Sequence, residues 1–188
     1  MRRSTVVIFL LFLVAAGAYY YLNNRPEPVD TEPTATPEPT VEVAYLFPAE
    51  AGAPTRIRLE AQTGEVVELA RDAENAWVMK LPSEGAADQG SAEAASSQIT
   101  TIRISDRIPN LEPTAVGLDD PAYILTVAFK NDGERTVEVG VVTPTESGYY
   151  VRMDNEIVIV SRSAIDALIG LLTNPPYAET PTPPPSDG

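Results

Sequence analysis

Cysteine and histidine are absent from this chain of 188 residues, and lysine occurs only twice, at Lys80 and Lys130. Their absence excludes disulfide bonds, zinc sites of the Cys/His type, thiol nucleophiles and every Ser–His or Cys–His catalytic pair. Any acid–base chemistry would therefore depend on carboxylates, tyrosines or the two lysines. A lipid-modified cysteine near the N-terminus is excluded as well.

Positive charge is scarce in this sequence. The chain contains 13 basic against 27 acidic side chains, which gives a formal net charge of -14 at pH 7. A molecule with this charge is repelled by phosphate backbones and by anionic lipid surfaces. We therefore expect no nucleic acid among its partners.

A long hydrophobic run occurs only at the N-terminus, directly after Arg2 and Arg3. Residues 5–22 are 18 uncharged and mostly apolar residues, and a helix of that length is roughly 27 Å long, enough for the hydrocarbon layer of a membrane. The tyrosines at 19–21 would form an aromatic belt at the outer interface. We expect residues 1–4 in the cytoplasm, a single-pass transmembrane anchor over 5–22, and the rest of the chain extracytoplasmic at the cell membrane.

The same segment fits a second interpretation, a cleavable signal peptide. Residues 16–18 (AGA) have the small-x-small form that signal peptidase accepts, and residues 6–14 are a suitable apolar core. The mature protein would then be secreted after cleavage. Under either interpretation the bulk of the chain is exported.

Proline and threonine crowd both sides of the foldable part. Residues 25–40 contain five prolines, four threonines and four acidic residues, a composition that stays solvated and extended. We expect a Pro/Thr-rich linker over residues 23–40 and a disordered proline-rich tail over 178–188. One folded domain then occupies residues 41–177.

Within this domain, apolar residues alternate in short runs separated by turn residues, which is typical of β-strands. The runs of the first half are 41–47, 55–61, 65–70 and 76–81, and those of the second half are 122–129, 135–141, 148–153 and 156–161. Between the last two runs, Asp154-Asn155 predicts a two-residue hairpin turn. Successive strands with short turns predict an antiparallel meander.

Two further segments carry the apolar period of a helix. Asp88 is a suitable N-cap for the first, which we expect to continue to about Ile104, and Ser161 or Ser163 suits the second. Their apolar stripes are Ala92, Ala95, Ile99 and Ile102, and Ile165, Leu168, Ile169 and Leu172. The sequence therefore predicts an α+β fold, an antiparallel β-meander plus helix, in two related units (βββα, then ββββα) within one compact domain.

Two adjacent carboxylates, Asp119 and Asp120, are the first candidate site residues. They stand between Gly117-Leu118 and Pro121, which is typical of a turn whose aspartates accept backbone hydrogen bonds ahead of a strand. The other interpretation makes them catalytic acids of a glycan hydrolase, which requires a further acid across a cleft. We prefer the turn and predict no catalytic residue.

Aromatic side chains supply a third candidate. Trp77 and Tyr149 share strand faces with apolar neighbours and are expected in the core, whereas Tyr150 alternates with them and points outward. An exposed tyrosine ring could bind a sugar or a peptidoglycan fragment. Tyr150, Asp119 and Asp120 are therefore the candidate ligand-binding residues.

Residues 131–134, with the sequence NDGE, resemble the start of a calcium loop. They lack the later acidic ligand at the required spacing, so we expect a hairpin turn there. No glycine loop followed by Lys-Ser/Thr occurs in the sequence. We predict neither a metal site nor a cofactor.

The chain resembles the DUF4340 family, bacterial membrane-anchored proteins without an established activity, in the segments VVELARDAENAWVMKLP, GLDDPAYILTVAF and GERTVEVGVVTPTESGYYVRMDNEIVIVSRSAIDALIGLL. The resemblance covers about residues 57–173, nearly all of the folded part. It implies a cell-envelope domain, and larger relatives look like accessory parts of ABC-type transport or gliding systems. It carries over no catalytic residue.

These observations predict a membrane-anchored extracytoplasmic domain that binds and does not catalyse. The expected partners are the cell membrane, through the N-terminal helix, and an envelope protein or a wall polymer, through one sheet face or edge. Two alternatives stay open, a carboxylate-dependent extracellular glycan hydrolase and a structural spacer.

Overall fold

The computed structural model describes residues 12–21 and 43–179. The chain divides into two units, residues 1–41 and 42–188. In the first, residues 12–21 form a helix with exposed side chains. No helix within the described residues is long and apolar enough to cross a membrane. The expected cytoplasmic end, the linker, part of the expected anchor and nearly all of the tail lie outside the described residues.

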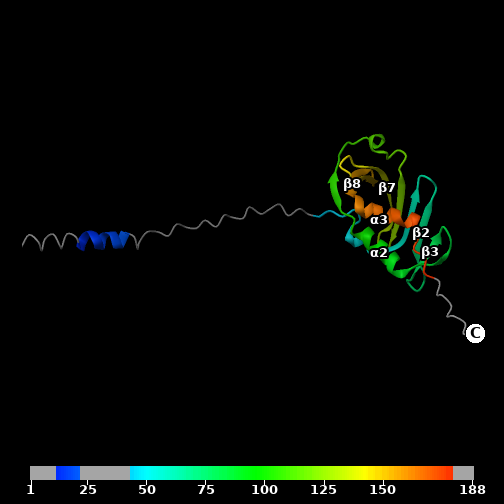
Figure 1. The fold of residues 1–188 in the computed structure, drawn as a ribbon, viewed down its shortest axis with the longest axis horizontal. Coiled ribbons are helices and arrows are strands. Elements are labelled where there is room, and N and C mark those ends of the chain that lie inside the picture. Colours follow the sequence, from blue (N-terminus) through cyan, green and yellow to red (C-terminus); the bar gives the residue numbers. More distant parts are fainter. Residues whose placement is uncertain (1–11, 22–42, 180–188) are drawn as a thin grey trace, which may run out of the picture. The chain divides into compact units, whose positions relative to one another are not determined.

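Among the described residues of the second unit, nine strands form one sheet (Figure 1). Neighbouring strands are all antiparallel, in the spatial order β4-β3-β2-β1-β6-β7-β8-β9-β5. The strands are β1 (Pro54–Ala61), β2 (Val66–Arg71), β3 (Trp77–Leu81), β4 (Gly85–Ala86), β5 (Ile104–Arg107), β6 (Tyr123–Phe129), β7 (Gly133–Val142), β8 (Gly148–Met153) and β9 (Glu156–Ser161).

Two meanders meet at the centre of this sheet, where β1 pairs with β6. The register places Ile57 opposite Val127 and Leu59 opposite Leu125, so the apolar sets of both strands lie on one face. From this seam β1–β4 extend in one direction and β6–β9 in the other, and β5 pairs with β9 at the far edge.

The α+β fold with a β-meander and helices is confirmed. The order of the regular elements is four strands, a helix, one strand, four strands and a helix, so the expected βββα unit omitted β4 and β5. The omission has a physical cause, since β4 has only two residues and β5 lies among exposed polar residues without clear alternation. A duplication of two related units stays a hypothesis.

The predicted turn between β8 and β9 is confirmed. Asp154 and Asn155 have φ angles of 52° and 66°, and Met153 pairs with Glu156 across them. Positive φ at both central residues defines the hairpin turn whose twist matches the flanking strands. Residues 130–132 connect β6 to β7 with Gly133 at a φ of 75°, so the NDGE segment forms a hairpin as expected.

Two helices, α2 (Gln89–Thr100) and α3 (Arg162–Thr173), contact each other and the same face of the sheet (Figure 1). The predicted N-cap is confirmed, because the Asp88 carboxylate accepts a hydrogen bond from the backbone N–H of Ser91 at 2.8 Å. Between helices and sheet lies the main core, which contains Ile57, Leu69, Met79, Ile99, Leu125, Val139, Ile165 and Leu168.

The prediction of a helix continuing to about Ile104 is wrong, because α2 ends at Thr100. The hydroxyl of Thr100 donates to the carbonyl of Ser97 at 2.9 Å, and that of Thr101 donates to the same carbonyl at 3.0 Å. Hydroxyls that bond the preceding turn, in a β-branched run, weaken the helix. Ile104 instead begins β5.

The prediction of a strand over 41–47 is wrong for the described residues 43–47. Only an isolated bridge joins Tyr45 to Arg103, and the consecutive residues Leu46 and Phe47 are both buried. A strand buries alternate residues on one face, whereas this segment passes into the core. The ring of Phe47 lies 5.0 Å from that of Phe129.

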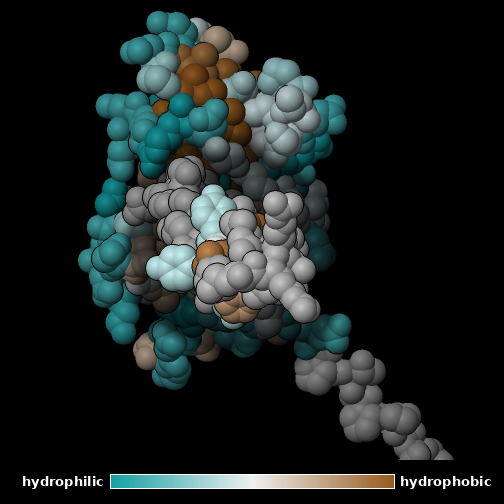
Figure 2. All heavy atoms as spheres, turned by 90° about the vertical axis from the view of Figure 1, so that its left-hand side faces the viewer, coloured by the Kyte–Doolittle hydropathy of each residue, from teal (hydrophilic) through white to brown (hydrophobic). Residues whose placement is uncertain are grey.

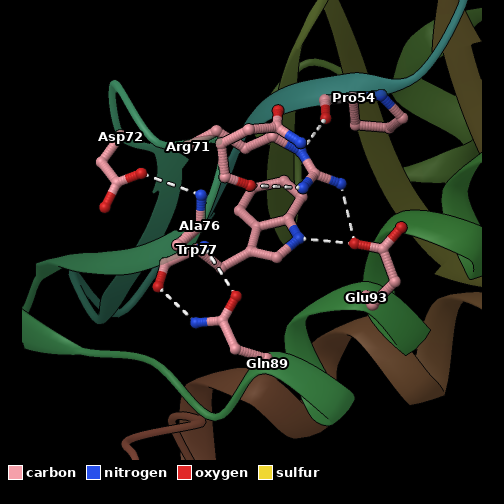
Figure 3. A network of polar contacts seen from close by, with 8 residues as sticks. Pro54, Arg71, Asp72, Ala76, Trp77, Gln89 and Glu93 are labelled. Atoms are coloured by element: carbon pink, nitrogen blue, oxygen red, sulfur yellow. Dashed lines mark hydrogen bonds and ion pairs between the residues drawn. The ribbon is translucent and has the colours of Figure 1, made fainter.

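A polar network holds the β2–β3 turn against α2 around Trp77, which is buried as expected (Figure 3). The indole N–H donates to Glu93 at 2.8 Å, and the Arg71 guanidinium lies 4.3 Å from the ring centroid. Arg71 also pairs with Glu93 at 2.7 Å. Gln89 donates to the Trp77 carbonyl at 2.8 Å and accepts from its N–H at 2.9 Å. The helix start is thereby fixed to the strand.

Candidate functional site

The open face of the sheet, opposite the helices, is covered over β7–β9 by the segment 108–122. This segment contains the short helix η2 (Pro113–Val116) and buries Val116 and Leu118 against Ile157 of β9. Gly140 permits the close crossing, because a Cβ there would lie 2.2 Å from the Val116 carbonyl oxygen. The segment therefore forms one wall of any binding site on this face.

Tyr150 lies beneath this covering segment. Its side chain is partly buried and packs on the small cluster of Val116, Leu118 and Ile157. It does lie on the opposite face from Tyr149, whose hydroxyl donates to Asp166 of α3 at 2.8 Å. Tyr150, which the sequence suggested as a platform for stacking a sugar, therefore supports the covering segment instead.

Burial of Tyr149, and then its hydrogen bond to Asp166, raise the pKa of its hydroxyl to about 12. The Arg162 guanidinium donates to the other oxygen of Asp166 at 3.2 Å. The first contact joins β8 to α3, and the second lies within α3 and orients Asp166. They secure the helix-covered face and leave the open face to other residues.

Asp119 and Asp120 are exposed and have different neighbours. Asp120 accepts a hydrogen bond from the side-chain amide of Gln62 in the β1–β2 turn. Asp119 lies near Arg152 and favours its cationic form. Among the described residues neither carboxylate accepts a backbone hydrogen bond, so the expected capping bonds are wrong. Asp120 therefore joins the loop to the β1–β2 turn, whereas Asp119 acts on Arg152 only through its charge.

Arg152 of β8 connects the covering segment to the sheet. Its Nε donates to Glu138 on β7, and its Nη2 donates to the Leu118 carbonyl at 2.9 Å. The hydrogen bond to Glu138 and the charges of Glu138 and Asp119 raise the pKa of Arg152 above its ordinary value. The guanidinium is therefore a fixed cation with a defined orientation.

A groove of about 870 Å³ lies between the start of this segment and the β8–β9 hairpin. Its polar lining consists of Arg107, Asn110, Arg152, Asp154, Asn155 and Glu156, and its apolar lining consists of Ile108, Pro109, Leu111, Pro113 and Ile157. A shallower depression of about 600 Å³ shares Arg152, Asp154 and Asn155 with it. Figure 2 shows one side of the molecule, where hydrophilic side chains border an apolar patch near the top. Neither Asp119 nor Asp120 lines the groove.

Every charged side chain that lines the groove has an ion-pair partner. Arg107 pairs with Glu156, and Arg152 pairs with Glu138. Asp154 accepts from Arg135 at 2.8 Å. The groove thus presents oriented donors and acceptors whose charges are balanced within the protein.

Both edges of the sheet are closed. Beside β4, the Ala178 N–H donates to the Ala86 carbonyl at 2.9 Å, and the Tyr177 hydroxyl donates to the Ser83 carbonyl at 3.0 Å. Beside β5, Ile104 N–H donates to the Ala44 carbonyl at 2.8 Å.

The remaining part of the β5 edge is protected as well. The Arg107 N–H is occupied by the carboxylate of Asp106 at 2.8 Å, and a register shift separates Ile104 from Asp106. Such devices oppose the addition of a foreign strand. Binding through an edge, which the sequence left open, is therefore disfavoured relative to binding on the open face.

A second hollow, of about 400 Å³, lies near the C-terminal end of α2. Tyr45, Phe47 and Phe129 line it together with uncharged residues such as Ala53 and Thr101. It is smaller and has no charged lining residue. Within the described residues, no group of three or more carboxylates is placed to hold a metal ion.

Comparison with known proteins adds no relative to this description. No protein-family model, no curated protein and no solved structure matches the chain. The interpretation of the groove therefore depends on the residues of this chain alone.

Sequence reasoning missed most of these residues. The alternation that places Tyr150 on the open face places Arg152 there too, and strand register would have put it opposite Glu138. Pro109 and Pro113 indicated a loop. One feature of the sequence indicated where that loop crosses the sheet, namely a glycine at position 140 within a strand.

Proposed function

We propose that this protein is a non-enzymatic binding module of the cell envelope, anchored by residues 5–22 and displayed outside the membrane on the linker 23–40. The apolar run, the linker composition and the resemblance to the DUF4340 family support this role. The resemblance also suggests an accessory position beside an ABC-type transport system. The module binds an envelope component in the groove on its open face.

One observation carries the proposal, namely a large groove lined by ion-paired arginines and by prolines while both sheet edges are closed. A volume of about 870 Å³ lies within the range of roughly 300–1,000 Å³ that is usual for ligand sites. The arginines on its walls are held by ion pairs, and prolines stiffen the loop. Preorganised walls favour binding, because little conformational entropy is lost when a partner is ordered against them.

Binding explains the carboxylates better than hydrolysis does. A glycan hydrolase needs two acids flanking one scissile bond. Asp119 lies near Arg152, while Asp120 accepts from Gln62. Asp120 helps to attach the covering segment through this bond, and the charge of Asp119 favours the Arg152 cation that also holds the segment. This segment is required for the groove, so the aspartates act on binding indirectly.

Photo-crosslinking in cells tests this function. A photoreactive residue at Glu112, an exposed residue between the lining residues Leu111 and Pro113, should form a reproducible adduct with an envelope component. The same residue at Glu74, an exposed glutamate in the β2–β3 turn, is the matched control and should form none. Equal adducts at both positions, or none at Glu112, would contradict the proposal. A third photoreactive residue is placed at Ala53, which lines the second hollow. If only this position forms an adduct, the binding site lies in the second hollow instead of the groove.

The intact mass of the protein purified from membranes tests the tether. We expect the uncleaved chain beginning at Met1, recovered in the membrane fraction and released only by detergent. A soluble product that begins after Ala18 would contradict anchoring and establish secretion instead. This measurement does not depend on the identity of the partner.

A further inference from the structure

We infer that the groove accepts an extended, uncharged peptide segment of a partner protein. This inference rests on the proposed function and goes further, because it chooses a protein partner over a wall glycan. It follows from the charge balance of the groove, from its free hydrogen-bonding groups and from the kind of apolar surface that it offers.

The charge balance of the groove favours an uncharged ligand. Arg107 and Arg152 are neutralised by Glu156 and Glu138, and Asp154 is neutralised by Arg135. A charged ligand would have to displace a partner from one of these pairs or stay without a compensating charge, and both are unfavourable. An ion-paired arginine can still donate to an uncharged acceptor, since Nη1 of Arg152 has no partner among the described residues.

The free hydrogen-bonding groups match a peptide backbone. Asn110 and Asn155 line the groove from its two walls, and among the described residues their side-chain amides have no hydrogen-bond partner. Each amide offers an acceptor and two donors, the combination that pairs with a backbone N–H and C=O. The backbone of a peptide lying between these two amides would pair with both of them. This pairing does not depend on the side chains of the peptide.

The apolar lining of the groove is aliphatic. Ile108, Leu111 and Ile157 contribute to it, and no aromatic ring is among its lining residues. Aromatic faces suit flat rings, whereas aliphatic surfaces suit the side chains of a peptide. The aromatic residues Tyr45, Phe47 and Phe129 line the other hollow instead. A stacked sugar ring therefore has no platform in the groove.

The absence of cysteine allows a direct test on the full-length protein in detergent. An environment-sensitive dye on Glu112→Cys reports binding at the groove, and the same dye on Glu74→Cys is the matched control. The probes are four: a nine-residue peptide of Ser, Thr, Val and Asn, two versions carrying two aspartates or two lysines, and a GlcNAc–MurNAc disaccharide. Each is titrated at low and at high salt.

We expect the uncharged peptide to bind at Glu112→Cys at least about ten-fold more tightly than the other three probes, with little dependence on salt. Adding Asn155→Gly should weaken this binding several-fold. Glycine tolerates the positive φ of position 155, so the turn is kept while the amide is lost. The control position should show no change.

Several results would overturn the inference. Tighter binding of a charged peptide would refute the charge argument, and tighter binding of the disaccharide would refute the choice of a protein partner. No binding of any probe at about millimolar concentration would refute it as well. A crosslink from Glu112 in cells, combined with any of these results, would leave the proposed function standing and remove only the ligand class.

Discussion

The two faces of the sheet use the same strands for different purposes. On the helix-covered face, alternate residues of every long strand enter one core, and the few polar contacts join strands to helices. On the open face, arginines pair with carboxylates of neighbouring strands, or across β6 for Arg56 and Glu134, and a loop covers only one side. The comparison teaches that stability is concentrated on the covered face, which leaves the open face free to bind.

The largest expected difference between the faces comes from two adjacent residues of β6. Leu125 points into the core and is 1% exposed, whereas Ile124 points to the open face and is 37% exposed. Leu125→Ala should lower the free energy of unfolding by about 2–5 kcal/mol, because it leaves a cavity. Ile124→Ala should lower it by less than about 1 kcal/mol. Urea unfolding of both variants checks the contrast, and equal losses would refute it.

The second effect concerns the crossing of the loop over β7. Gly140→Ala places a Cβ against the Val116 carbonyl and should destabilise the protein by about 1–3 kcal/mol. The matched change, Gly170→Ala in α3, meets no atom within 4 Å and should stabilise the helix by about 0.5–1 kcal/mol. Thermal unfolding of the two variants measures both changes in stability. A Gly140→Ala protein as stable as the parent would mean that the loop does not rest on β7.

The third effect follows from the raised pKa of Tyr149, about 12 in the folded protein against an ordinary 10.0. A raised folded-state pKa stabilises the fold below the unfolded-state pKa, and this contribution is lost as pH rises through the folded value. We expect the parent to lose stability between about pH 10 and pH 12 more steeply than Tyr149→Phe. Unfolding free energies at increasing pH measure it. Parallel curves would mean that the hydroxyl is not held by burial and Asp166.

The smallest effect is expected at acidic pH, from Glu93. The hydrogen bond from Trp77, and then the Arg71 cation, lower the pKa of Glu93 below its ordinary value of 4.5. A lowered folded-state pKa stabilises the fold above the unfolded-state value, and the contribution is lost as pH falls through the folded value. The stability difference between the parent and Glu93→Gln should therefore shrink below about pH 4. Fluorescence of Trp77, the only tryptophan, follows the unfolding. A difference that persists at low pH would contradict this role of the carboxylate.

Local patterns in the sequence were sufficient for much of the covered face. Alternation identified most strands, the Asp154-Asn155 pair identified its hairpin, and the stripe of Ile165 and Leu168 identified the buried side of α3. These features depend on neighbours within a few residues. The pairing of β1 with β6 could not be read locally, because nothing near either strand specifies a partner so distant in the chain.

The open face was harder to predict for the same reason. Tyr150 was correctly placed on the opposite face of β8 from Tyr149, and the same alternation places Arg152 beside it, but the segment that covers them comes from before β6. Asp119 and Asp120 attracted attention as an adjacent pair, whereas the groove is lined by residues of two segments that are distant in the chain, 107–113 and 152–157. Pair motifs are visible in a sequence, and contacts across a sheet are not.

The most direct test of the separation between the faces compares stability and binding in one variant, Asn155→Gly. The account predicts that the crosslink from Glu112 in cells falls several-fold while the free energy of unfolding changes by less than about 0.5 kcal/mol. An unchanged crosslink, or a loss of crosslink accompanied by an equal loss of stability, would contradict it.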